Sequence, residues 1–220
     1  LIMGNEKILV ERTENIPVTF GGKARFMIEN VLAATLAAVA SHIPVYTIAQ
    51  GLRTFKPSSE TTPGRLNMFD IKDFRFIVDY AHNHHGVVAL GQFINQLNAA
   101  CKIGIISVAG DRIESEIVNV GRAAAQIFDK IIVRIDEDTR GRRIEEIADL
   151  LVKGIYQVNK NLPVEIIPDE VEAMNYALEH ATPGCVVVVL CEKVNKCIAF
   201  VKEYKRKAEE QYQLESATGQ

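Results

Sequence analysis

From residue 75 onward, short apolar runs alternate with longer segments in which apolar residues recur every three or four positions. Apolar runs of about five residues are typical of buried strands, and the longer periodic segments are typical of amphipathic helices. The clearest strand is the valine-rich run at 186–190. The repeated strand–helix order predicts an α/β fold with a mostly parallel sheet and helices on both faces. The predicted strands are 75–78, 103–108, 130–134, 164–167 and 186–190, and the predicted helices are 84–100, 114–128, 143–158, 170–180 and 193–212.

The first 55 residues follow a different pattern, which predicts a short α+β unit. Apolar residues at helical spacing predict a helix over 24–41, and a shorter helix is predicted over 45–55. Two short strands are predicted at 7–10 and 18–20. The stretch that follows is rich in Pro, Ser and Thr and is typical of a linker. The predicted organisation is a unit over 1–55, a linker over 56–63, a domain over 64–212 and a tail over 213–220, of which 215–220 is expected to fray.

Composition and charge exclude several classes of protein. Of the 220 residues, 48% are hydrophobic, which is enough for a substantial core. The formal net charge of −3, with no extended run of Lys and Arg, argues against nucleic-acid binding. The longest apolar run, 185–191, is far shorter than the roughly 20 residues of a membrane span. No signal peptide is evident, and because the chain opens on Leu1 we expect a piece of a longer cytoplasmic protein.

The cysteines support the same compartment. They show no CxxC spacing and lie in or beside apolar runs, which predicts reduced, buried thiols. The four are Cys101, Cys185, Cys191 and Cys197.

Polar residues collect where the predicted strands end. Ligands of an open parallel sheet bind beyond the carboxyl ends of its strands. The rule selects five loops in this chain. They are 79–83, which carries Asp79, His82 and Asn83; 109–112, which carries Asp111 and Arg112; 135–142, which alternates acids and arginines; 168–169; and 191–193.

Each loop also has a structural interpretation. Asp169 is expected to cap a helix, whereas for Asp111 capping and ligand binding stay equally open. The 135–142 loop has the alternative of a self-paired, solvated surface, although it holds more polar residues than a turn needs. The histidines around His82 do not have the spacing of metal ligands on one helix face, so no metal site is predicted in this chain.

A complete phosphate-binding loop is missing from the pattern. Residues 21–24 end like a P-loop, but Pro17 stands where its first glycine belongs and Ala24 lacks the hydroxyl that would hold Mg²⁺. The Pro-Gly-Arg turn at 63–65 places Arg65 as a ready partner for phosphate. The chain therefore carries half of a nucleotide site, and we expect it to bind its ligand jointly with another segment.

Six motifs, taken in order, resemble the C-terminal part of Mur-type ligases. These enzymes use ATP to join an amino acid to a carboxylate through an acyl phosphate. The resemblance implies that 1–55 is the end of the ATP-binding central domain and that 64–212 is a Rossmann-like C-terminal domain. The motifs are Gly-Lys-Ala-Arg-Phe at 22–26, Glu-Asn-Val-Leu-Ala-Ala at 29–34, Pro-Gly-Arg-Leu-Asn at 63–67, Asp-Tyr-Ala-His-Asn at 79–83, Gly-Asp-Arg at 110–112 and the stretch 128–142.

The resemblance also implies residue roles. Asn30 is expected near the adenine of ATP, Arg65 at its phosphates as the catalytic cation, and Asp79 at the ribose. His82 and Asn83 lie in the same motif as Asp79. His82 is expected among the catalytic residues, and Asn83 among the residues that bind ATP. An acceptor amino acid would meet Asp111, Arg112, Asp136, Glu137, Asp138 and Arg140.

One residue departs from the family pattern. Met27 stands where similar members usually have Asn. A thioether cannot replace an amide that both donates and accepts hydrogen bonds, so the adenine side is expected to differ.

The motifs are most like a branch of the family that adds arginine to the aspartate side chains of a polymer. That likeness implies ATP and Mg²⁺ as cofactors, with the metal ligands mainly outside this chain. The expected partners are arginine, a carboxylate polymer, a P-loop domain and an ATP-grasp domain, and a homo-oligomer is an open expectation. The chain alone is expected to be inactive. Two alternatives stay open: another Mur-type ligase, acting on a cell-wall precursor or a folylpolyglutamate, or a non-catalytic binding or assembly module.

Overall fold

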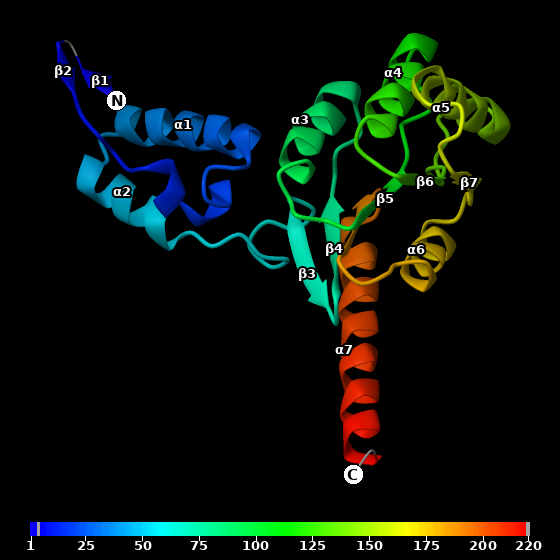
Figure 1. Ribbon diagram of the computed structural model, residues 1–220. Helices are drawn as coiled ribbons and strands as arrows, with labels where there is room; N and C mark the ends of the chain where they lie inside the picture. The colour runs from blue at the N-terminus through cyan, green and yellow to red at the C-terminus, as the bar shows by residue number, and fades with distance from the viewer. Residues whose placement is uncertain (4, 219–220) are drawn as a thin grey trace. The chain divides into compact units, whose positions relative to one another are not determined.

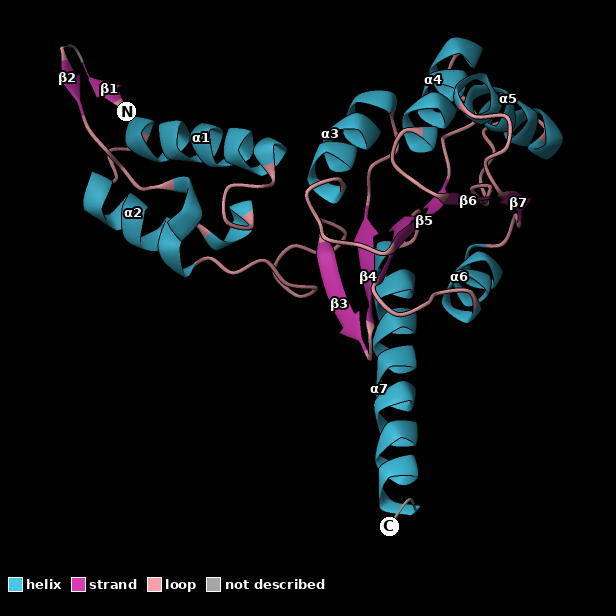
Figure 2. Cartoon of the chain, in the orientation of Figure 1, coloured by secondary structure: helices cyan, strands magenta, loops and turns pink. Residues whose placement is uncertain are grey.

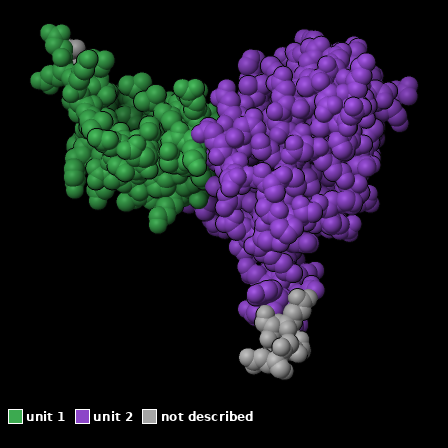
Figure 3. All heavy atoms as spheres, viewed as in Figure 1, with its two compact units in different colours: residues 1–57 green, residues 58–220 purple. Residues whose placement is uncertain are grey.

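The computed structural model describes residues 1–3 and 5–218 (Figure 1). The chain divides into two compact units, Leu1–Pro57 and Ser58–Gln220, which Figure 3 colours separately. The division falls inside the segment 56–63 that is expected to be a linker.

The first unit is built mainly from two helices joined by short turns. The predicted strand at 18–20 is wrong, because Pro17 and Thr19 lie in a 3₁₀ turn instead. Pro17 has no N–H to give to a sheet, and the Thr19 hydroxyl bonds the carbonyl oxygens of Thr13 and Ile16. Of the predicted strand at 7–10, only Lys7 lies in a strand, where it pairs with Ile2 in a two-residue antiparallel ladder. The elements are β1 (Ile2–Met3), β2 (Glu6–Lys7), η1 (Thr13–Asn15), η2 (Pro17–Thr19), α1 (Arg25–Ala40) and α2 (Val45–Thr54).

A six-stranded sheet organises the second unit, in the order β3-β4-β8-β5-β6-β7. Figure 2 draws the strands in magenta. All neighbours are parallel except β3 and β4, which form an antiparallel pair at one edge. The mostly parallel α/β fold predicted from the sequence is therefore confirmed. The strands are β3 (Asn67–Ile71), β4 (Phe74–Asp79), β5 (Cys101–Ile106), β6 (Lys130–Val133), β7 (Val164–Ile166) and β8 (Cys185–Leu190).

Helices cover both faces of this sheet (Figure 1). One face packs against α6 and α7 through alternate strand residues such as Phe76, Ile105 and Val187. The other face lies under α3, α4 and α5, and there Phe128 fills the space left by Gly104. The strands are buried on both faces, so they read as continuous apolar runs. The helices are α3 (His84–Ile94), α4 (Glu114–Ala125), α5 (Ile144–Val158), α6 (Glu170–Glu179) and α7 (Val194–Thr218).

Two glycines let α4 and α5 touch through their backbones. A Cβ on Gly121 would lie 2.2 Å from the carbonyl oxygen of Leu151, and one on Gly154 would lie 2.1 Å from that of Val118. Only glycine permits this approach without shifting a helix.

Three boundaries differ from the sequence prediction. The edge strand β3 was not predicted, because Asn-Met-Phe-Asp-Ile has no clear alternation. Helix α3 ends at Ile94 rather than 100, where polar residues replace the apolar spacing. The predicted tail from 213 is wrong as far as Thr218, because α7 continues through Gln, Leu, Glu and Ala, which are good helix formers.

The cysteines correct another expectation. Cys101 and Cys185 form a disulfide, so they are not reduced thiols. They are the first residues of adjacent parallel strands and pair directly across the ladder, which brings their Cα atoms to 4.6 Å. Cys191 and Cys197 are free and buried, as predicted.

Candidate ligand site at the strand ends

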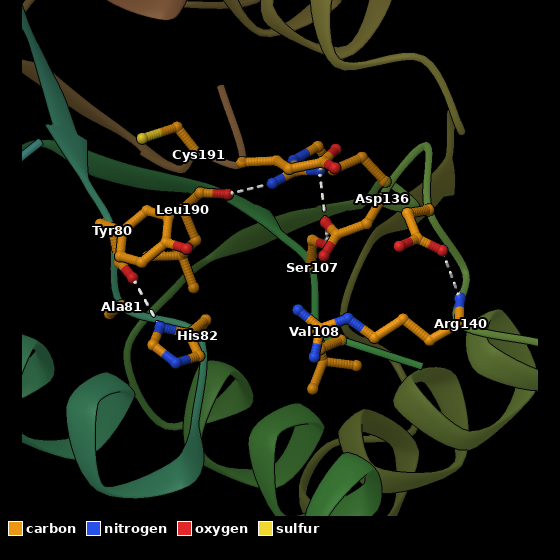
Figure 4. Close-up of a pocket in the computed structure, with 13 residues that line it drawn as sticks. Tyr80, Ala81, His82, Ser107, Val108, Asp136, Arg140, Leu190 and Cys191 are labelled. Carbon is orange, nitrogen blue, oxygen red and sulfur yellow. Dashed lines mark hydrogen bonds and ion pairs between the residues drawn. The ribbon is translucent and has the colours of Figure 1, made fainter. Parts of the chain in front are cut away.

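Four of the five predicted loops line one cavity of about 190 Å³ at the carboxyl ends of the strands. Its walls come from residues 80–82 after β4, 107–109 after β5, 134–140 after β6 and 190–192 at the end of β8. Figure 4 places Tyr80 and His82 on one side of the cavity and Asp136 and Arg140 on the other. The fifth predicted loop holds Asp169, whose carboxylate caps α6 as expected.

His82 is held in a defined tautomer. Its Nδ1 lies 3.0 Å from the carbonyl oxygen of Tyr80. A carbonyl oxygen only accepts, so Nδ1 carries the proton and donates it. The other ring nitrogen, Nε2, is then an acceptor in the neutral ring, which suits the binding of a donor in the cavity.

Arg134 is a buried cation surrounded by three carboxylates. Only 2% of its side chain is exposed. Its Nη1 lies 2.8 Å from Asp136 and 3.9 Å from Glu192, and its Nη2 lies 3.2 Å from Glu170. Nη2 also donates to the carbonyl oxygen of Leu190 at 2.7 Å. The guanidinium therefore joins the ends of β6 and β8 to the start of α6.

The carboxylates of this cluster are further fixed by local donors. The Ser107 hydroxyl donates to Asp136, and the Glu192 N–H donates to Glu170 at 2.8 Å. Glu192 itself accepts the N–H of Glu137 at 3.0 Å. The cluster thus combines side chains from four segments that are far apart in the sequence.

Arginines hold the two loops on the far side of the cavity together. Arg140 donates to Asp111 at 2.8 Å. This hydrogen bond is the largest of the causes that lower the pKa of Asp111, and the positive charge of Arg140 lowers it further. Arg142 donates to the carbonyl oxygens of Gly110 and Arg112 at 2.8 and 3.0 Å. The loops 109–112 and 139–142 are therefore bonded to each other.

Asp79 fixes the turn that carries Arg65. Its two oxygens accept the N–H groups of Leu66 and Ala81, each at 2.9 Å, and only 6% of the residue is exposed. Burial raises the pKa of Asp79, and these backbone hydrogen bonds oppose the rise. The Arg65 guanidinium is exposed and lies over the Tyr80 ring, 5.8 Å from its centroid. Tyr80 also lines the cavity, so one ring separates Arg65 from it.

Both asparagines that are predicted to bind ATP make hydrogen bonds within the protein. The Asn83 carboxamide oxygen accepts the N–H of Gly86 at 2.8 Å and caps α3. Asn30 lies on α1 in the first unit and donates to the sulfur of Met27 at 3.7 Å. The unusual Met27 thus contacts the residue predicted to lie near adenine.

The structure brings together only part of the predicted site. His82, Asp136, Asp138 and Arg140 line the cavity. Asp111 pairs with Arg140 outside the lining, Arg112 contributes its carbonyl oxygen to Arg142, and Glu137 pairs with Lys193, which lowers the pKa of Glu137. In residues 1–3 and 5–218, no group of three or more His, Cys, Asp or Glu is placed to hold a metal ion.

Sequence reasoning missed three residues at the base of the cavity, Ser107, Arg134 and Glu170, and it selected the loop of Glu192 without naming Glu192 as a site residue. One signal was available: Arg134 follows three apolar residues of a buried strand directly. A charge in that position is rarely buried without partners. Finding those partners required the positions of the strand ends in space.

The fold and the strand-end cavity define an α/β domain with a cavity at the position where open parallel sheets bind their ligands. Residues 64–192 match the family described as Mur ligase, glutamate ligase domain. The chain belongs to the Mur ligase family.

Two relatives show which ligases this chain is similar to. The chain is similar to the cyanophycin synthetase of Synechocystis sp., with 44% identity over 93% of this chain and 23% of that protein. It is also similar to the UDP-N-acetylmuramoyl-L-alanyl-D-glutamate–2,6-diaminopimelate ligase of Caldanaerobacter subterraneus, with 29% identity over 74% of this chain and 33% of that protein. The chain spans about a quarter of the length of the cyanophycin synthetases that it matches.

Solved structures share the fold. E. coli FolC in complex with DHPP and ADP matches with a TM-score of 0.61 and 19% identity, over 80% of this chain and 39% of that one. Within the described residues, no helix has both the length and the apolar character that crossing a bilayer requires.

Proposed function

We propose that this chain forms the closing half of an ATP-dependent ligase of the cyanophycin synthetase type, which adds arginine to the aspartate side chains of a polymer. The observation that carries the proposal is the position of Arg65. The Asp79 carboxylate holds its turn, and its exposed guanidinium lies over Tyr80 at the edge of the cavity. A cation for phosphate thus lies next to a cavity suited to an amino acid.

The reaction accounts for these residue types. Attack of a polymer carboxylate on the γ-phosphate of ATP releases ADP and leaves an acyl phosphate. The amine of the amino acid then attacks the acyl carbon, phosphate leaves, and the amine loses its extra protons. Negative charge develops on phosphate oxygens in both steps, so fixed cations and correct positioning supply the catalysis. In this chain, Arg65 is the cation that would stabilise the charge on the phosphate oxygens.

The described residues fit this division of labour. Arg65 suits a phosphate group, whereas no cluster of carboxylates or histidines in the described part of the chain suits Mg²⁺. We propose that the metal ligands lie mainly, and the phosphate loop wholly, in a segment outside this chain, and that the protein acts in the cytoplasm, where ATP is abundant. Asn83 keeps its amide N–H groups for the nucleotide, since only its oxygen caps α3.

The test uses the full-length protein with ATP, Mg²⁺, a poly-aspartate primer and arginine, and it follows phosphate release and product mass. Replacing Arg65→Ala is expected to lower kcat by about 100-fold or more, the usual effect of removing a group that stabilises transition-state charge. The melting temperature should stay unchanged, because the guanidinium is exposed.

A matched control is Arg75→Ala. Arg75 lies at the other end of β4 and pairs with the exposed Asp70, so its loss should leave turnover unchanged. Wild-type turnover in the Arg65 variant would overturn the proposed role of Arg65. A wild type that consumes no ATP with any amino acid would favour a non-catalytic binding module.

A further inference from the structure

Asn67 is a buried amide that holds the backbone just before Arg65. Only 3% of the residue is exposed. Its Oδ1 accepts the N–H of Gly64 at 2.7 Å, and its Nδ2 donates to the carbonyl oxygen of Thr62 at 3.0 Å. An amide makes both bonds at once because it carries an acceptor and a donor side by side. The side chain therefore spans the three residues that precede Arg65.

The end of β4 holds the same turn from a second direction. The N–H of Leu66 donates to the Asp79 carboxylate at 2.9 Å, and the N–H of Tyr80 donates to the carbonyl oxygen of Gly64 at 2.9 Å. The amide brace comes from β3, which pairs with β4 in the antiparallel edge of the sheet. The backbone around Arg65 is thus bonded to both strands of that pair.

The turn needs this support because its backbone is strained. Gly64 and Leu66, the residues on either side of Arg65, have φ angles of 71° and 49°. That left-handed region suits glycine and disfavours leucine. Glycine is also required at 64 for space, since a Cβ there would lie 2.7 Å from the Val194 side chain. Strained backbone persists only where its surroundings fix it, and it collects at functional sites.

The braced turn decides where the Arg65 guanidinium lies. Among residues 1–3 and 5–218, the Arg65 side chain makes no hydrogen bond or ion pair, and it lies over the Tyr80 ring, 5.8 Å from its centroid. Its position therefore depends mainly on the backbone that carries it. A cation that stabilises charge on a reacting phosphate is effective only when it is correctly placed.

We propose that Asn67 is a positioning residue of the ligase reaction, which fixes the backbone of Arg65 and so directs its guanidinium to the phosphate oxygens. Asn67 touches no ligand in this role, because its carboxamide is buried and both of its polar atoms bond the turn. The inference rests on the proposed ligase function. It gives a role to a residue that the sequence motif contains but does not explain.

The experiment is a double-mutant cycle in the full-length enzyme with ATP, Mg²⁺, a poly-aspartate primer and arginine. Asn67→Leu removes both bonds at similar volume and should lower kcat about 10- to 100-fold, the range for misplacing a group at the reacting centre. The KM for arginine should change less than about 3-fold, since the brace does not contact the amino acid. In an Arg65→Ala background the same change should lower kcat less than about 3-fold, because the cation that Asn67 positions is already absent.

Two further variants separate positioning from damage to the fold. Asn67→Ser leaves room for a water that can satisfy the backbone groups without fixing them, so it should lower kcat while keeping a melting temperature closer to wild type. It keeps the cycle measurable even if the leucine variant is unstable. The matched control is Asp129→Ala, which removes the acceptor of the Lys102 N–H, 2.8 Å away, at the amino end of β5. It should leave kcat unchanged with or without Arg65.

The outcomes distinguish the two proposals. Equal losses from the Asn67 variants with and without Arg65 would overturn the positioning role while the ligase function stands. Wild-type kcat in both Asn67 variants would do the same. A wild type that ligates no amino acid would overturn both.

Discussion

The two ends of the central sheet differ in how completely their polar groups are satisfied. At the amino end of β5 and β8, a disulfide joins Cys101 to Cys185, and the N–H of Gly184 donates to the Asp73 carbonyl oxygen at 2.7 Å. At the carboxyl end of the same strands lie a cavity, three carboxylates that share Arg134, and an Arg134 Nε–H that has no hydrogen-bond partner among the described residues. The same two strands thus begin where covalent and hydrogen bonds join the chain and end where a cavity opens to solvent.

The difference separates stability from function within one sheet. The amino end is complete without a ligand, so changes there should affect folding and leave turnover alone. At the carboxyl end, Arg134 both holds the strand ends together and lines the cavity, so changes there should affect both folding and turnover. The following variants test that separation.

The largest effect is expected from Arg134→Met. The change leaves three carboxylates without their shared cation and should lower the free energy of unfolding by about 3–5 kcal/mol, as for other broken buried ion pairs. Urea denaturation of the chain would measure it. Adding Glu170→Gln to Arg134→Met should recover part of the loss, because it removes one of the orphaned charges. A loss below about 1 kcal/mol would show that the cluster is hydrated rather than buried.

A smaller effect is expected from reducing the disulfide. The bond closes a loop between residues 84 positions apart, and cross-links of this kind stabilise by about 2–4 kcal/mol. Denaturation with and without reductant would measure the change. Cys101→Ser should show no response to reductant, and turnover of the full-length enzyme should not change in either case. Lost turnover after reduction would contradict the separation of the two ends.

The smallest effect is expected from Asp79→Asn, which lies at the carboxyl end but is satisfied internally. An amide would turn a donor toward the N–H of Leu66 or Ala81, at a cost of about 1–3 kcal/mol.

The cost should depend on pH in a definite direction. Burial raises the pKa of Asp79 above its ordinary 3.8, so its stabilising contribution is complete below that pH and declines as the pH rises through the raised value. The stability difference between wild type and Asp79→Asn should therefore narrow from about pH 4 toward neutrality. A difference that widens over this range would mean that the buried carboxylate is stabilised as an anion.

Local patterns were sufficient to predict most of this fold. The run at β8 is apolar on both faces because helices cover both, so it stands out in the sequence. The edge strand β3 was missed because its pairing with β4, not its own composition, holds it in place. The same limit applies to the disulfide, which depends on the register of β5 against β8.

The site was predictable only in outline. The rule that ligands bind at strand ends selected four loops that line one cavity, because the direction of the strands is implied by their order. It did not show that Asp136 is committed to Arg134 or that Glu137 lies on the rim with Lys193. Those pairings join residues from different strands and helices, and no spacing along the chain encodes them.

The glycine contacts between α4 and α5 bear on the loops at one side of the cavity. Gly121 and Gly154 bring the two helix backbones together, and Arg142 bonds the two loops that precede these helices. Tyr80 and His82 lie on the opposite side of the cavity, and no bond to these two loops holds them there among the described residues. Tyr80 also supports the Arg65 guanidinium. A shift of Tyr80 would therefore also move the guanidinium that lies over its ring, and this would couple the shape of the cavity to the position of the cation proposed to meet phosphate.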